Sequence, residues 1–380
     1  MCWALLAFMI SFNLFIPELN SMISSLGGAD LKGLNFLLFS FAALISRPIS
    51  GKLSDTIGRI KVMYIGLFIG LIVTLMYPIC GALWIFLLLR FSHGFSAGFL
   101  PTGATALVTD LIPVEGRGVA MGIWGTFISV GFGVGNFFST YITHPIGLTG
   151  LFLVAASFAI IAGILMAMLS ETLPNPQSFT FSHLKIKMND VVEPTVLPAA
   201  IVMFCSATST GVVFVTTPDI SEYLGIENKG WFFLFYMSST ILIRLFASSW
   251  SDRIGRRKVL IFGLGFMVLG MLTVGFAQEW MMYTLGAILF GVSTGISSPT
   301  VFAWTADLSP ITRRGVGAGT VFMALEAAII FGAVLTLRFY DNQPSTIPIV
   351  YSLAAIMSIV GMLYLFWHMR TQSKSEKLEF

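Results

Sequence analysis

A short loop, residues 51–61, directly follows an apolar segment and reads Gly51-Lys-Leu-Ser-Asp55-Thr-Ile-Gly58-Arg59-Ile-Lys61. A near copy follows another apolar segment in the second half of the chain and reads Trp250-Ser-Asp252-Arg253-Ile-Gly255-Arg256-Arg257-Lys258. In such a loop glycine permits a tight turn, the carboxylate can accept backbone N–H groups at a helix N-terminus, and the cations can pair with carboxylates or lipid phosphate. The pattern predicts a latch between helix ends; the alternative is a positively charged loop with an incidental aspartate.

The two loops belong to an internal repeat, which indicates a duplicated unit. A constant shift of 197 residues, from Asp55 to Asp252, also carries many other charged residues and glycines onto identical residues. The matched pairs include Arg47 and Arg244, Gly94 and Gly291, Gly98 and Gly295, Asp110 and Asp307, and Arg117 and Arg314.

The composition indicates a protein that crosses a membrane many times. Hydrophobic residues make up 56% of the 380 residues and charged residues only 10%, against about 45–50% and about 25% in a soluble domain. Each bilayer crossing takes about 20 apolar residues. Apolar stretches fall near residues 2–23, 31–50, 62–80, 83–107, 117–141, 147–169, 196–218, 229–249, 259–277, 280–304, 315–338 and 346–369.

These stretches predict an all-α integral membrane protein with twelve transmembrane helices in two six-helix bundles. We expect an N-terminal bundle over residues 1–170, a linker over 171–194, a C-terminal bundle over 195–370 and a tail over 371–380. Because each half has an even number of spans, both halves enter the membrane in the same orientation, as in a parallel repeat.

Other classes of function find no support in the sequence. The net charge of +3 is too small and too scattered for nucleic-acid binding. The three cysteines form no CxxC pair, which argues against a metal site or a disulfide framework. No Walker-type phosphate-binding loop occurs, so ATP is not expected to supply the energy. We therefore expect no enzyme activity, no cofactor and no metal, and a process driven by an ion or substrate gradient.

The distribution of Lys and Arg predicts the orientation in the membrane. Loops after the even-numbered spans and the C-terminal tail hold most of the cations, whereas the opposite side holds only Lys32, Lys229 and Arg338. Because cytoplasmic loops carry the excess of Lys and Arg, both termini are expected in the cytoplasm. No Asn-x-Ser/Thr glycosylation site occurs, which favours a bacterial inner-membrane protein.

The doubled motif G-x-L-x-D-x-x-G-R-x-K, placed after spans two and eight of twelve, resembles the signature loop of the major facilitator superfamily. The resemblance covers essentially the whole chain and implies two bundles that rock about a midplane site. It also implies that Asp55 meets the start of span 11 near Arg314 and Gly315 when the transporter is open outward. Asp252 would meet the start of span 5 near Arg117 and Gly118. The residues that we assign to this cytoplasmic gate are Gly51, Asp55, Gly58, Arg59, Lys61, Asp110, Arg117, Asp252, Gly255, Arg256, Lys258, Asp307 and Arg314.

Arg90 and His93 lie inside the predicted fourth span. Arg90 is about 9 Å from Trp84 at the outer edge, and a charge at that depth normally faces a partner or a cavity. The segment Arg90-x-x-His93-Gly94 is similar to the family's span-four motif, in which the arginine is linked to proton coupling or to recognition of a substrate carboxylate. The alternatives are a structural ion pair or snorkelling for Arg90, and a neutral core histidine for His93.

Glu326 lies about 18 Å along span 11 from Arg314, near the middle of the membrane. No Lys or Arg stands near it in the same span, and the charged form of a carboxylate without a neighbouring cation is disfavoured. We hypothesise that Glu326 is a proton site that interacts with Arg90 or His93. The alternative is a permanently protonated residue that is hydrogen-bonded between helices.

Small residues and amides mark spans five and one. Gly131 and Gly135 belong to a pattern similar to the glycine-rich motif of drug/proton antiporters, with Phe132 where that motif has proline. Glycines let helices pack closely. Asn13 and Asn136 can hydrogen-bond either a substrate or a neighbouring helix.

The leading hypothesis is a secondary transporter that exports a drug-like compound or metabolite by proton-coupled antiport, from resemblance to the drug and metabolite efflux branch. The alternative is an importer or exchanger of an organic anion, with Arg90 as the ligand of the substrate carboxylate. A third hypothesis is a membrane sensor or scaffold that transports nothing. The expected partners are a small-molecule substrate, protons and the lipid bilayer, with no nucleic acid and no obligate protein partner, so that a monomer is possible.

Overall fold

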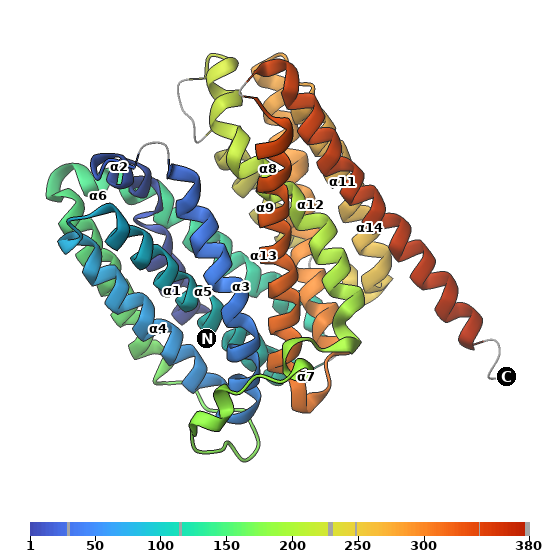
Figure 1. The fold of residues 1–380 in the computed structure, drawn as a ribbon. Coiled ribbons are helices and arrows are strands. Elements are labelled where there is room, and N and C mark those ends of the chain that lie inside the picture. The colour runs from blue at the N-terminus through green and yellow to red at the C-terminus, as the bar shows by residue number, and fades with distance from the viewer. Residues whose placement is uncertain (29–30, 114–115, 227–230, 248, 342, 377–380) are drawn as a thin grey trace. The chain divides into compact units, whose positions relative to one another are not determined.

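The computed structural model describes residues 1–28, 31–113, 116–226, 231–247, 249–341 and 343–376. Within these residues the secondary structure consists of helices and turns, without a strand (Figure 1). The all-α prediction is confirmed.

The helices follow the predicted spans closely. In the first half they are α1 (Cys2–Asn13), α2 (Leu19–Ser25), α3 (Lys32–Thr56), α4 (Arg59–Met76), α5 (Leu83–Leu111) and α6 (Arg117–Met166). The linker contains the short α7 (Met188–Val191). In the second half they are α8 (Leu197–Tyr223), α9 (Trp231–Ala247), α10 (Trp250–Ile254), α11 (Arg256–Gly275), α12 (Trp280–Leu308), α13 (Arg314–Phe339) and α14 (Ile347–Glu376).

Nine helical stretches of the described chain are long and apolar enough to cross a membrane. Two of them, Arg117–Ser139 and Tyr141–Met166, lie within the long α6, which is interrupted by the non-helical Gly147 at φ 70°. The three other predicted spans correspond to α1 with α2, to the charged helix α3, and to α9 with α10. The structure is therefore consistent with twelve spans.

The first predicted span is a broken helix, whereas its repeat counterpart is continuous. α1 ends at Asn13, and a 3-10 turn (Ile16–Glu18) separates it from α2. Pro17 lies in this turn, and its missing N–H and fixed φ interrupt helical hydrogen bonding. The counterpart α8 runs without interruption from Leu197 to Tyr223.

Contacts divide the chain into two compact units. Unit 1 comprises Met1–Ile112, Thr126–Val196 and Leu308–Glu326, and unit 2 comprises Pro113–Gly125, Leu197–Asp307 and Ala327–Phe380. The start of α6 is therefore packed within unit 2, and the start of α13 within unit 1. The domain bounds expected from the sequence stay a prediction.

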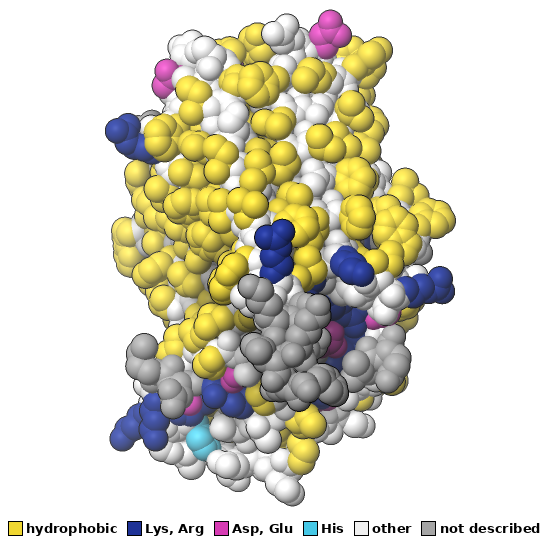
Figure 2. Space-filling model, turned by 90° about the vertical axis from the view of Figure 1, so that its right-hand side faces the viewer, with side chains coloured by type: hydrophobic (Ala, Val, Ile, Leu, Met, Phe, Trp, Pro, Cys, Tyr) yellow, Lys and Arg dark blue, Asp and Glu magenta, His cyan; other side chains and the backbone are white. Residues whose placement is uncertain are grey.

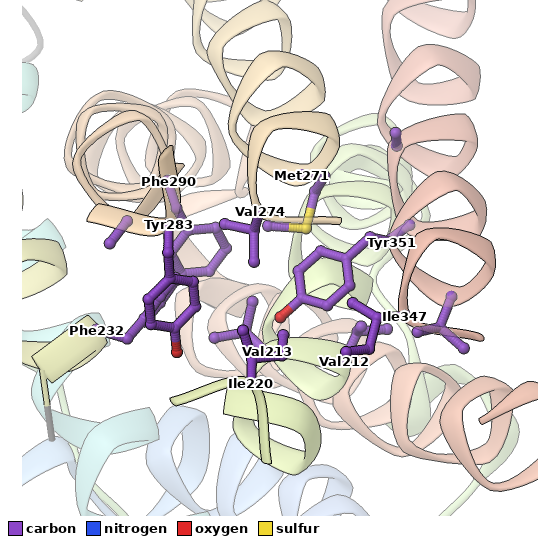
Figure 3. Packing of buried hydrophobic residues seen from close by; sticks show 14 of the residues in the cluster. Val212, Val213, Ile220, Phe232, Met271, Val274, Tyr283, Phe290, Ile347 and Tyr351 are labelled. Carbon is purple, nitrogen blue, oxygen red and sulfur yellow. The ribbon is translucent and has the colours of Figure 1, made fainter. Parts of the chain in front are cut away.

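Each unit has its own apolar core. In unit 1 the core includes Phe15, Tyr77 and Phe152. In unit 2 it includes Phe232, Val274, Tyr283, Phe290 and Tyr351, whose side chains pack together in Figure 3. Glycines bring the same helix pairs together in both units: a Cβ on Gly94 would collide with the carbonyl oxygen of Phe39, and one on Gly291 with that of Tyr236.

The surface agrees with an integral membrane protein. Hydrophobic side chains cover much of the face shown in Figure 2, and most of its Lys and Arg side chains lie in the lower half of that view. Many large apolar side chains on the spans are exposed, among them Phe68, Leu88, Phe262 and Leu363. Hydrocarbon side chains in such positions suit contact with lipid tails.

Candidate functional site

Asp55, at the end of α3, binds the N-terminus of α13. Its Oδ1 accepts the N–H of Gly315 at 2.7 Å and its Oδ2 accepts the N–H of Val316 at 2.8 Å. Because the first N–H groups of a helix have no partner inside the helix, they are suited to hold a carboxylate. A Cβ on Gly315 would lie 2.5 Å from the carbonyl oxygen of Gly51, so the close approach requires glycine.

Two arginines and a second aspartate extend this contact. Arg59 donates through Nη1 to Asp55 at 2.5 Å and through Nε to Oδ2 of Asp110 at 3.1 Å. Oδ1 of Asp110 accepts from Nη1 of Arg314 at 2.7 Å. Asp55, Arg59, Asp110 and Arg314 thus form one chain of charge-assisted hydrogen bonds, called the first network below.

The second copy of the motif makes the same bonds. Asp252 accepts the N–H of Gly118 at 2.9 Å and that of Val119 at 3.2 Å. Arg256 donates to Asp252 and, at 2.9 Å, to Asp307, which also accepts from Arg117 at 2.8 Å. The second network therefore comprises Asp252, Arg256, Asp307 and Arg117.

Of the remaining residues assigned to the motif, the glycines shape the backbone and the lysines lie at the surface. Gly58 and Gly255 precede α4 and α11 with φ of 122° and 99°, a region that favours glycine. Lys61 and Lys258 are exposed, and among the described residues neither takes part in an ion pair of the networks.

Sequence reasoning missed Glu171 and Thr172, which follow the sixth span. Glu171 accepts the N–H groups of Arg59 and Ile60, both at 3.0 Å, and so caps the N-terminus of α4. The Thr172 hydroxyl donates to Asp110 at 2.6 Å. The available signal was the position of Glu171 as the first acidic residue after an apolar span.

The cationic partner of Glu326 is Arg47, and the hypothesis that Glu326 interacts with Arg90 or His93 is wrong. Nη2 of Arg47 in α3 lies 3.2 Å from Oε1 of Glu326. Nη1 of Arg47 donates to Thr102 at 3.0 Å, and its guanidinium carbon lies 4.2 Å from the ring centroid of Phe322. Both charged side chains are buried. The partner comes from a distant part of the sequence rather than from Arg90 or His93.

The position of Arg47 in the sequence indicates an arginine inside the membrane, but Arg47 was interpreted only as a member of the repeat. It precedes Asp55 in the same helix by about 12 Å at ~1.5 Å per residue, which places it inside the membrane. An intramembrane arginine needs a partner, and the intramembrane Glu326 was the available one.

Arg90 and His93 are both 2% exposed, in unit 1. The guanidinium carbon of Arg90 lies 4.8 Å from the ring centroid of Phe39. The ring of His93 packs against those of Phe12 and Phe15, with centroids 5.2 and 5.4 Å apart. No carboxylate of the described chain forms a salt bridge with Arg90, so the structural ion pair considered above is not found there.

The two asparagines bond to their own helices. Nδ2 of Asn13 donates to the carbonyl of Met9, and Nδ2 of Asn136 to that of Phe132, both at 2.8 Å. Gly131 and Gly135 of α6 lie against α1, because a Cβ on either would lie within 3 Å of Met9 or Asn13. Close packing of α1 and α6 accounts for these glycines.

The linker is attached beside the first network. Nζ of Lys52 lies 2.7 Å from Oδ2 of Asp190, and Nε of Arg313 lies 2.9 Å from Oε2 of Glu193. The pKa of Asp190 is lowered: slight burial acts to raise it, but hydrogen bonds from Lys52 and from the N–H of Lys187 outweigh burial.

The chain is similar to known transport proteins along most of its length. A sequence profile of the Major Facilitator Superfamily matches residues 1–187 and 199–379. The multi-drug resistance efflux pump PmrA of Streptococcus pneumoniae serotype 4 is 25% identical over 349 residues, which cover 86% of this chain and 83% of that protein. The multidrug resistance protein MdtG of Proteus mirabilis is 26% identical over 300 residues, which cover 73% and 72%.

Two solved structures share the fold. The human organic anion transporter MFSD10 (TETRAN) superposes with a TM-score of 0.83 at 18% identity, covering 96% of this chain and 97% of that one. The proton:xylose symporter XylE superposes with a TM-score of 0.75 at 15% identity, covering 96% and 94%.

Proposed function

The chain belongs to the major facilitator superfamily, and we propose that it exports a small drug-like compound or metabolite in exchange for protons. Proteins of this family are secondary transporters and not enzymes. The chain is accordingly a multi-pass integral membrane protein that binds a small-molecule substrate. The direction of transport is proposed from PmrA and MdtG, which are named as efflux and resistance proteins.

The observation that carries the proton coupling is the buried ion pair of Arg47 and Glu326. A buried charge is stable only while it is paired, and breaking such a pair costs about 3–5 kcal/mol. Protonation of Glu326 removes the negative charge and leaves Arg47 without compensation. Proton binding therefore weakens the bond between α3 and the first half of α13, which are also joined by Asp55.

The two networks are proposed as the gate at the cytoplasmic side. The excess of Lys and Arg at their end of the spans supports this side and a cytoplasmic position for both termini. The bacterial relatives support the inner membrane. Opening this side requires Asp55 and Asp252 to release the helix N-termini that they hold. One chain contains both networks, so a monomer suffices.

The test is dye accumulation in an efflux-deficient bacterium, with wild type, Glu326→Gln and the exposed control Glu279→Gln at equal membrane expression. The dyes are rhodamine 6G, a lipophilic cation, and fluorescein, an aromatic carboxylate. We expect wild type and Glu279→Gln to lower the accumulation of at least one dye, and a protonophore to abolish the effect. Glu326→Gln should raise accumulation to the level of the empty vector.

Two results would contradict the proposal. Accumulation of both dyes at the empty-vector level by wild type would refute export of such compounds, and accumulation above that level would indicate uptake. The same protonophore sensitivity in Glu326→Gln as in wild type would remove Glu326 from the coupling.

A further inference from the structure

The Arg47 guanidinium has acceptors on two different helices of unit 1. Nη2 lies 3.2 Å from Oε1 of Glu326 in α13. Nη1 lies 3.0 Å from Oγ1 of Thr102 and 3.3 Å from the carbonyl oxygen of Gly98, both in α5. The Arg47 side chain is 3% exposed, so its donors depend on acceptors from the protein. Arg47 therefore joins α13 through an ion pair and α5 through hydrogen bonds to neutral groups.

The Thr102 hydroxyl is oriented to accept from Arg47. It donates its own proton to the carbonyl of Gly98 at 2.8 Å, which leaves the lone pairs of Oγ1 for the guanidinium. The Gly98 carbonyl also accepts from the Ser50 hydroxyl at 2.8 Å, and this bond ties α3 to α5 at the same level. Thr102 and Ser50 are fully buried. Because neither the hydroxyl nor the carbonyl titrates near neutral pH, this set of acceptors is the same at every pH of interest.

The surroundings of Glu326 contain one other group that carries a charge. Arg47 faces the carboxylate from α3, and the Ser40 hydroxyl of α3 is also hydrogen-bonded to it. The ring of Phe322 in α13 lies against the guanidinium, with its centroid 4.2 Å from the guanidinium carbon. These hydroxyl and aromatic neighbours do not titrate near neutral pH. Protonation of Glu326 therefore removes the ionic acceptor in α13 and leaves the neutral acceptors in α5 unchanged.

The second copy of the repeat keeps the arginine without the neighbouring threonine. The shift of 197 residues gives the matched pairs Arg47 and Arg244, Thr102 and Pro299, Ser40 and Met237, and Ser129 and Glu326. Arg244 donates to the carbonyl of Gly125 in α6. The fold can therefore hold a buried arginine at this place without the threonine hydroxyl. The hydroxyl occurs in the copy of the repeat in which the arginine also has a carboxylate.

We propose that Thr102 is a positioning residue for the proton coupling, because it keeps the Arg47 guanidinium attached to α5 when Glu326 is protonated. Arg47 then stays with α3 and α5, and α13 is the helix that is released. Without the Thr102 hydroxyl, protonation of Glu326 would leave a buried charge with too few acceptors, and proton binding would be opposed. This inference rests on the proposed function, in which Glu326 is the proton site.

The first experiment compares unfolding temperatures of the purified full-length chain in detergent and needs no substrate. Thr102→Val is introduced into wild type, into Arg47→Gln, and into Glu326→Gln, which is neutral like the protonated carboxyl group. We expect Thr102→Val to lower the unfolding temperature about twice as much in Glu326→Gln as in wild type, because Thr102 is then the main partner of the guanidinium. In Arg47→Gln its effect should be close to zero.

Thr300→Val is the matched control. Thr300 is buried in α12, next to the counterpart of Thr102, and donates to the carbonyl of Ile296 in its own helix at 2.7 Å. Its effect on the unfolding temperature should be the same in all three backgrounds. Thr102→Ala removes the hydroxyl without placing a methyl group against the guanidinium, and it repeats the test should Thr102→Val fail to fold.

The second experiment measures the initial efflux rate of an exported dye at external pH values from 5 to 8. Thr102→Val should shift the pH of half-maximal rate towards acid by about one pH unit, because protonation of Glu326 then leaves the guanidinium without the hydroxyl acceptor. Thr102→Ser keeps the hydroxyl and should retain the wild-type profile, as should Thr300→Val. A purely structural role of Thr102 would lower the rate by the same factor at every pH.

An equal effect of Thr102→Val in wild type and in Glu326→Gln would overturn the proposal, and so would a rate that falls by the same factor at every pH. The result separates from that of the proposed function. Absence of dye efflux by wild type, together with the larger thermal effect in Glu326→Gln, refutes export and keeps the bond of Thr102 to Arg47. Efflux that depends on Glu326, together with equal thermal effects, refutes the role of Thr102 alone.

Discussion

The first and second networks are built from the same bonds but lie in different surroundings. In both, an aspartate holds two N–H groups of a helix start, and a second aspartate joins two arginines. The Arg59 side chain is 1% exposed and its counterpart Arg256 is 11% exposed. Asp110 is 11% exposed and its counterpart Asp307 is 25% exposed. The motif determines which bonds form, whereas the neighbouring chain decides how far they are removed from water.

The neighbours of the first network explain the difference. Glu171 caps α4 and Lys52 pairs with Asp190 of the linker. The repeat shift places His368 where Glu171 stands and Ser249 where Lys52 stands. The carboxylate of Glu171 and the ammonium group of Lys52 therefore have no counterpart in the second half. A charge-assisted hydrogen bond is stronger when it is buried than when it is exposed to solvent, so the bonds of the two networks should differ in strength.

The largest expected effect is that of Asp55→Asn compared with Asp252→Asn. Asparagine leaves one acceptor for the helix N–H groups and removes the charge that pairs with the arginine. For the first network, whose Arg59 and Asp110 are more buried than their counterparts, we expect a loss of about 3 kcal/mol of folding free energy and a tenfold or greater drop in the efflux rate. Asp252→Asn should lose about half as much, because water reaches its partners.

Unfolding temperature and initial efflux rate of both variants test this order. A greater loss in Asp252→Asn would show that exposure does not set the strength of the two networks.

An effect on folding free energy of similar size is expected where the two copies differ in charge. Arg47 pairs with Glu326, whereas its counterpart Arg244 donates to the carbonyl of Gly125. Arg47→Gln leaves a buried carboxylate uncompensated, at a cost of about 3 kcal/mol, and adding Glu326→Gln should recover about 1–2 kcal/mol of it. Arg244→Gln should cost about 1–2 kcal/mol, since a neutral carbonyl is easier to leave unpaired.

A double-mutant cycle on unfolding free energy measures the coupling. Strict additivity of Arg47→Gln and Glu326→Gln would show that the pair contributes nothing beyond its separate parts.

The smallest effect concerns the linker, where Asp190 forms a partly exposed ion pair with Lys52 beside the first network. Because the pKa of Asp190 is lowered on folding, its carboxylate stabilises the folded state above the ordinary pKa of about 3.9 and loses that contribution as the pH falls through the lowered value. Asp190→Asn should cost less than about 1 kcal/mol at pH 7.

The difference in unfolding temperature between wild type and Asp190→Asn should hold from pH 7 down to about pH 4 and close as the pH falls further. It should also become smaller in high salt. A gap that widens towards acid pH would reverse the assigned direction of the pKa shift.

Much of the fold could be predicted because its signals are local or repeated. Long apolar stretches located the spans, since a bilayer admits few other backbone structures. The resemblance placed Asp55 near Arg314 and Gly315, and Asp252 near Arg117 and Gly118. The structure shows the two aspartates bound to the N–H groups of Gly315 and Gly118. These contacts join the repeated motif to the start of a helix, and both features can be recognised in the sequence.

Three features of the site were not predicted from the sequence. The interaction of Glu326 was assigned to Arg90 or His93, whereas its partner Arg47 lies in another helix. The end of α1 at Asn13 lies inside a stretch that was interpreted as one span, although Pro17 stands within it. The buried side-chain atoms of Asn35, which have no hydrogen-bond partner in the described chain, are recognised only when every neighbour of the side chain is placed.

The sequence by itself determined the apolar spans and the duplicated motif, because hydrophobic length and local turn chemistry act over a few residues. Only the tertiary structure decided which buried charges are paired and which polar groups are left without partners. Pairing depends on distances of a few ångströms between side chains far apart in the chain, and those distances follow from how the helices pack.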